Sequence, residues 1–192
     1  MKNDYFDSAI KQFLYYKKLG EKTFDQIPED QLFWQPNAQS NSIATIVKHL
    51  SGNMLSRWTD FLTTDGEKPW RDRDGEFEQD MASKAELLSR WEKGWKALLD
   101  TLNLLSDEDL NKIVYIRNQG HTVREAINRQ LAHYPYHVGQ IVYIGKMLAT
   151  NWQTLSIAKG KSTGFNADKF AREKGRGHFT DEFLNRNDVP EQ

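Results

Sequence analysis

Apolar residues recur at helical spacing in four separate stretches of the chain. In each stretch they fall at positions i, i+3, i+4 and i+7, which is typical of one buried face of an amphipathic helix. The stretches run from about Asp4 to about Phe24, from Ser42 to the turn TTDG, from Ser83 to about Leu102, and from Thr122 to about Ala149. Four helices of this length with almost no strand predict an all-α fold, a four-helix bundle.

Polar residues mark where three of these helices begin. Ser42 is a suitable N-cap, because its hydroxyl can accept a hydrogen bond from the first helical turn. The sequences SKAE, from Ser83, and TVRE, from Thr122, have the capping-box pattern, in which a Glu three residues on reaches back to the helix start. Both patterns therefore predict a helix N-terminus.

The connections between the helices are long, so a simple up-down-up-down order is not assured. Residues 113–123 (IVYIRNQGHTV) predict a small hairpin around Gly120, just before the last bundle helix. Residues 151–192 are rich in Gly, Lys, Asn and Asp and have no sustained period. We expect a bundle domain at residues 1–150 and, at 151–192, an irregular C-terminal extension that packs on it and ends in a loose tail.

Composition narrows the classes of function. The net charge of −1 gives no reason to expect a nucleic-acid or membrane partner, and no apolar run is long enough to span a bilayer. The N-terminus lacks the apolar core of a signal peptide, so we expect a cytoplasmic protein. The chain has no cysteine, which excludes thiolate ligands and cysteine nucleophiles. Any metal must bind His, Asp or Glu, and any thiol must come from outside.

Two histidines mark the candidate chemistry. His133 and His137 lie four residues apart on the fourth helix, so both can reach one metal ion. His49, beside Ile46 and Leu50 on the second helix, is the natural third ligand. Three imidazoles without a carboxylate leave coordination positions open, as in catalytic sites. The alternative, that these are surface histidines or core histidines with protein partners, stays open from sequence alone.

Several other residues near the histidine pair, and the two remaining histidines, also allow predictions. Pro135 removes one backbone hydrogen bond and is expected to bend the helix locally, either to aim the ligands or only to fit the packing. Gln140 shares the histidine face, and we predict that it bonds a metal-bound water or substrate. Gly139 either lets another element approach closely or is tolerated at a cost of about 1 kcal/mol against Ala. His121 is expected in a turn and His178 in solvent.

Several stretches resemble the DinB-like superfamily. They are VKHLSGNM around His49, HYPYHVGQI with the histidine pair, and the connector IPEDQLFWQP. GEKPWRDRDGEF and LSIAKGKS are similar to a subfamily of unknown function, although a Pro is expected where Ala158 stands. The resemblance implies a four-helix bundle with a divalent metal held by His49, His133 and His137. The superfamily includes bacillithiol transferases, a mycothiol-dependent maleylpyruvate isomerase and metal-dependent hydrolases, and homodimers are common in it.

Three candidate functions are consistent with these residues and with the resemblance, and a small molecule is the expected substrate. The favoured one is a transferase that uses a low-molecular-weight thiol, with Arg71 and Arg73 (and Lys68) binding the carboxylates of that cofactor. The second is a hydrolase that activates water, with Glu76 or Asp60 as base if folding brings either near. The third is a non-catalytic, stress-related metal-binding protein. Zinc or nickel suits the imidazoles best, with iron or manganese as alternatives.

Overall fold

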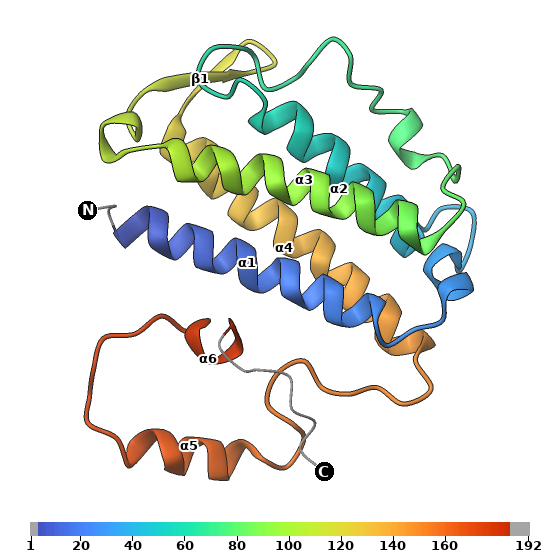
Figure 1. The fold of residues 1–192 in the computed structure, drawn as a ribbon, viewed down its shortest axis with the longest axis vertical. Coiled ribbons are helices and arrows are strands. Elements are labelled where there is room, and N and C mark those ends of the chain that lie inside the picture. The colour runs from blue at the N-terminus through green and yellow to red at the C-terminus, as the bar shows by residue number, and fades with distance from the viewer. Residues whose placement is uncertain (1–3, 185–192) are drawn as a thin grey trace.

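The computed structural model describes residues 4–184 and is built around four long helices (Figure 1). They are α1 (Asp4–Phe24), α2 (Ile43–Trp58), α3 (Lys84–Leu104) and α4 (Val123–Leu148). Sheet in the described part of the chain is limited to one two-stranded ribbon. The predicted all-α bundle is therefore confirmed.

The second helix is the most buried of the four. It packs mainly against α3 and also meets α4, while α1 lies along α4. Fourteen of the sixteen residues of α2 are buried, because the long connection after it covers the side that α3 and α4 leave free. Large aromatic side chains fill the core between the helices, among them Phe6, Phe13, Trp58, Trp91, Trp95 and Tyr134. Burying this apolar surface is the main force that holds the helices together.

The helix starts follow the predicted capping. Ser42 Oγ accepts from the Thr45 amide at 3.1 Å, and Thr122 and Glu125 form a complete capping box. At α3 the Ser83 hydroxyl accepts from the Glu86 amide at 3.2 Å, as predicted. The Glu86 carboxylate, however, accepts from the amide of Ala82 rather than Ser83, so this box closes one residue earlier.

The predicted hairpin is present, with its turn shifted. Strand β1 (Ile113–Ile116) pairs antiparallel with β2 (Gln119–Thr122), and Gly120 lies inside β2 opposite Tyr115. The turn residues are Arg117 and Asn118, with φ values of 54° and 59°, which is the backbone that a tight two-residue hairpin turn requires. The prediction centred the turn on Gly120 because glycine is the usual residue at such a turn.

Short helical turns complete the connections and the extension. They are the 3-10 turns η1 (Glu29–Phe33), η2 (Gly75–Phe77) and η3 (Asp107–Asp109), and the helices α5 (Ser162–Phe170) and α6 (Asp181–Leu184). The expectation that His178 is solvated is wrong: its Nε2 lies 3.0 Å from Ser8 Oγ on α1. Thr180 beside it is fully buried, and Lys11 on α1 pairs with Asp181 at 3.1 Å. The end of the predicted loose tail, residues 185–192, lies outside the described residues.

No helix within residues 4–184 is long and apolar enough to cross a membrane.

Pro135 does not interrupt α4, which runs unbroken from Val123 to Leu148. The loss of one backbone hydrogen bond is thus accommodated within the bundle.

Two helical glycines give opposite predictions for stability. A Cβ on Gly20 of α1 would lie 2.5 Å from Trp91 Cζ2, whereas a Cβ on Gly139 of α4 would meet no atom within 4 Å. Gly139 is therefore tolerated at a cost and does not serve close approach. We expect Gly20→Ala to lower the free energy of unfolding by about 1–3 kcal/mol through overpacking. Gly139→Ala should raise it by up to about 1 kcal/mol. Urea denaturation of both variants checks this, and equal destabilisation by both would contradict the packing described.

Candidate metal centre

Three histidines from two helices converge between α2 and α4. His49 comes from α2, and His133 and His137 come from successive turns of α4. Their candidate ligand nitrogens all lie within 4.8 Å of one another. His49 is buried, and the other two histidines are partly exposed. The residues predicted as metal ligands are therefore brought together and can hold a metal ion.

An oxygen atom faces the Nδ1 atom of each of these histidines. His49 Nδ1 lies 2.9 Å from Glu76 Oε2, His133 Nδ1 lies 3.2 Å from Gln130 Oε1, and His137 Nδ1 lies 3.2 Å from Gln140 Oε1. Oxygen acceptors at these positions favour the tautomer with the proton on Nδ1. The lone pair of each ring is then on Nε2, which points into the cluster.

The spacing of two Nε2 atoms tests whether a cation fits. His133 Nε2 and His137 Nε2 are 3.1 Å apart. If both carry lone pairs, they repel each other unless a positive charge lies between them. Zinc–imidazole bonds of about 2.0–2.1 Å in a tetrahedral site place two nitrogens roughly 3.3 Å apart. The pair is therefore spaced to bind one metal ion, and a nitrogen of His49, within 4.8 Å of both, can serve as the third ligand.

Burial favours the neutral form of two of these imidazoles, those of His133 and His137. Burial lowers the pKa of His133 to about 3, and the positive charges of His137, His49, Arg57 and Arg129 act in the same direction. Burial likewise lowers the pKa of His137, with His49 adding to the effect and the Gln140 hydrogen bond opposing it. Only the neutral imidazole can bind a metal. At neutral pH His133 and His137 are thus in the form that can bind a metal.

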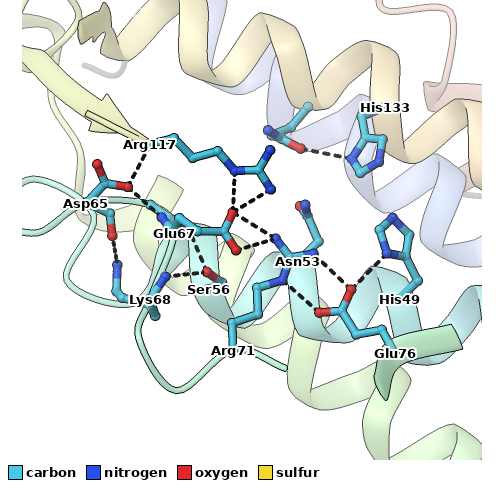
Figure 2. A network of polar contacts seen from close by, with 12 residues as sticks. His49, Asn53, Ser56, Asp65, Glu67, Lys68, Arg71, Glu76, Arg117 and His133 are labelled. Carbon is cyan, nitrogen blue, oxygen red and sulfur yellow. Dashed lines mark hydrogen bonds and ion pairs between the residues drawn. The ribbon is translucent and has the colours of Figure 1, made fainter. Parts of the chain in front are cut away.

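A buried ion-pair network contacts His49 at its Nδ1 atom, through Glu76 (Figure 2). Arg71 donates from Nε to Glu76 Oε1 at 2.7 Å and from Nη2 to Glu76 Oε2 at 2.9 Å, and it also contacts Glu67. Burial would raise the pKa of Glu76, but its hydrogen bonds with His49 and Arg71 outweigh burial and lower it. Glu76 is therefore a carboxylate fixed in place to accept from His49, as second-sphere partners of metal ligands commonly are.

A glycine makes room for this carboxylate. A Cβ on Gly52 of α2 would lie 2.2 Å from Glu76 Oε1. The Glu76 side chain therefore lies directly on the backbone of α2, one turn from His49. Phe77, the next residue, stacks on the His49 ring with centroids 5.1 Å apart and an interplanar angle of 26°. Together the two residues of η2 fix both the orientation and one face of this imidazole.

The structure places the other predicted site residues in different settings. Gln140 contacts His137, so it lies beside the cluster, where its predicted catalytic role stays a prediction. The guanidinium of Arg71 is held by Glu76 and Glu67, with a side chain only 2% exposed, and Arg73 is exposed on the same connection. Of the two candidate bases, Glu76 contacts the cluster through His49. Asp60 lies in the turn after α2, where its carbonyl accepts from Thr63 and Thr64.

Two supporting residues, Gln130 and Phe77, were not assigned a role from sequence, and Gln140 was predicted to bond a metal-bound water or substrate rather than to orient His137. Gln130 stands three residues before His133, and Gln140 stands three residues after His137. Residues three apart face each other on a helix, so this spacing is a local signal for an amide that orients each ligand. Phe77 has no such signal, because its contact with His49 depends on the path of the whole connection after α2.

The fold and the cluster define a class of protein: a helical bundle with a three-histidine site that can bind a divalent metal. A family model described as a protein of unknown function (DUF1572) matches residues 1–161. The chain belongs to this family, which is DinB-like, so the resemblance seen in the sequence is confirmed at that level. No curated protein matches the chain significantly.

Loss of the Glu76 carboxylate should weaken metal binding. We expect Glu76→Ala to reduce zinc affinity about 10- to 100-fold, because His49 loses the acceptor that orients its ring. Competition with a chromophoric chelator measures the affinity. Glu78→Ala, two residues away on the exposed side of the same connection, is the matched control and should bind zinc like the wild type. Equal affinities of all three proteins would show that Glu76 does not support the centre.

Proposed function

We propose that this protein is a metal-dependent transferase that uses a low-molecular-weight thiol. One observation carries the proposal: nitrogens of three histidines converge, while the Nδ1 of each ring faces an oxygen of the protein. Such a centre has no carboxylate ligand within residues 4–184 and would leave coordination positions for an external ligand. A bound divalent cation lowers the pKa of a thiol or a water molecule that it coordinates.

The state of Glu76 favours a thiol over water. Activation of water needs a base to accept its proton, and Glu76 is engaged by both Arg71 and His49. A thiol with an ordinary pKa of about 8.5 ionises on a metal with far less help than water needs. Since the chain has no cysteine, the thiol would be supplied by a small molecule. The thiolate would then attack an electrophilic small-molecule substrate, whose leaving group departs with the bonding electron pair.

The resemblance to the DinB-like superfamily supports the same proposal. Bacillithiol transferases belong to that superfamily, and so does a mycothiol-dependent isomerase. We also propose from this resemblance that the chain forms a homodimer. Arg73, exposed on the connection that carries Glu76, is the candidate for binding a cofactor carboxylate, because Arg71 is already held by two carboxylates. Zinc or nickel suits three imidazoles best, with iron or manganese next.

A hydrolase is the second candidate. It is favoured by the presence of one carboxylate, Glu76, in contact with a ligand of the centre. Release of Glu76 from Arg71 during the reaction would make it available as a base. A non-catalytic, stress-related metal-binding protein is the third candidate, and it would need the same three histidines.

Metal content and thiol conjugation test the proposal together. We expect the purified protein to hold close to one divalent metal per chain and His133→Ala/His137→Ala to hold none. With zinc or nickel bound, the wild type should accelerate conjugation of bacillithiol or mycothiol to monochlorobimane, followed by fluorescence. The double variant should not accelerate it. His178→Ala, which changes a histidine on the other side of α1, should behave like the wild type.

Different negative results in these assays distinguish the three candidate functions. A metal-loaded protein that cleaves a nitrophenyl ester but conjugates no thiol would favour the hydrolase. A metal-loaded protein inactive in both assays would favour the binding protein. A protein that takes up neither zinc, nickel, iron nor manganese would contradict all three.

A further inference from the structure

A chain of buried hydrogen bonds runs from the core to the edge of the metal centre. Trp58 Nε1 donates to Tyr134 Oη at 3.0 Å, and Tyr134 Oη donates to Asn53 Oδ1 at 3.1 Å. Trp58 and Tyr134 are almost completely buried, and Asn53 is 6% exposed. Burying polar groups costs free energy, even when they are hydrogen-bonded to one another. This arrangement is therefore expected to add little to the stability of the folded protein.

The chain of donors fixes the orientation of the Asn53 amide. An indole N–H can only donate, so the Tyr134 hydroxyl must accept from Trp58. Its single proton is then directed at Asn53, and the atom that receives it must be the amide oxygen. The Asn53 oxygen therefore faces Tyr134, and its NH2 group is turned to the other side. Among residues 4–184, no protein acceptor for Asn53 Nδ2 is found within hydrogen-bond distance.

The position of Asn53 relates this NH2 group to the metal centre. Asn53 follows His49 by one turn on the same face of α2, and Tyr134 follows His133 directly on α4. In Figure 2 the Asn53 side chain stands in the space between α2 and α4, beside His49 and His133. The Asn53 amide thus lies beside the histidine cluster, and its NH2 group is the part of the amide that Tyr134 does not engage.

We infer that Asn53 donates a hydrogen bond to an oxygen of the substrate held at the metal centre. The substrate class is then an electrophile with a carbonyl or an anionic oxygen next to the metal-bound atom. Tyr134 and Trp58 are positioning residues, because they act only through the amide of Asn53. This inference rests on the proposed metal centre but is independent of whether a thiol or water is the nucleophile.

Two probe ligands test the inference without any assay of turnover. The protein is loaded with cobalt(II), and binding is followed in its visible absorption bands. Acetohydroxamate carries oxygens that can accept from Asn53, whereas imidazole binds the metal and offers no oxygen. Asn53→Ala should bind cobalt like the wild type, weaken acetohydroxamate about tenfold, and leave imidazole within twofold. Tyr134→Phe should weaken acetohydroxamate about threefold, because the amide loses its fixed orientation.

Asn128→Ala is the matched control. Asn128 lies on the outer side of α4, where its Oδ1 accepts from Tyr5 at 2.7 Å, and neither probe should respond to its loss. Unchanged acetohydroxamate affinity in Asn53→Ala, with cobalt bound, would overturn the inference. An equal loss for both probes would also overturn it, since Asn53 would then only support the centre. A wild type that binds no cobalt would overturn the proposed centre itself, and the inference with it.

Discussion

The 3.1 Å approach of His133 Nε2 to His137 Nε2 is the constraint on which the rest of the centre depends. With Gln130 and Gln140 oxygens at the opposite nitrogens, both imidazoles present lone pairs to the same point. Burial then prevents either ring from relieving the repulsion by taking up a proton at neutral pH, because it holds the pKa of both below the ordinary value. A cation is the simplest partner for such a pair, and His49 is placed to share it.

The orientation of His49, the third candidate ligand, depends on a part of the molecule outside the four helices. The connection between α2 and α3 lies over α2 and brings Glu76 and Phe77 onto the His49 ring. Arg71 and Glu67 hold this connection, and Arg117 of the hairpin turn binds Glu67 in turn (Figure 2). Opposite charges alternate along this network, so each buried ion has a partner. The orientation of one candidate metal ligand is thereby linked to the hairpin through a series of side-chain contacts.

Local rules account for the parts of the structure that the sequence predicts well. Capping by Ser42 and Thr122 acts within one turn, and the spacing of His133 and His137 fixes their common face without any tertiary information. The contact of Glu76 with His49 joins residues 27 positions apart through an irregular connection. The sequence does not determine the path of such a connection, so Glu76 could be proposed as a neighbour of the site only on the condition that folding brings it near. His178 was misplaced for the same reason, since its partner Ser8 lies 170 positions away.

The orientation of the three imidazoles is the most direct test of the central claim. Long-range nitrogen–proton correlation NMR of 15N-labelled protein distinguishes the two ring nitrogens of each histidine. It would be recorded at neutral pH, first metal-free and then with one equivalent of zinc. The account predicts that His49, His133 and His137 carry their protons on Nδ1 and that zinc shifts the three Nε2 signals. Zinc-induced shifts at Nδ1, or at the Nε2 of fewer than three of these residues, would contradict it.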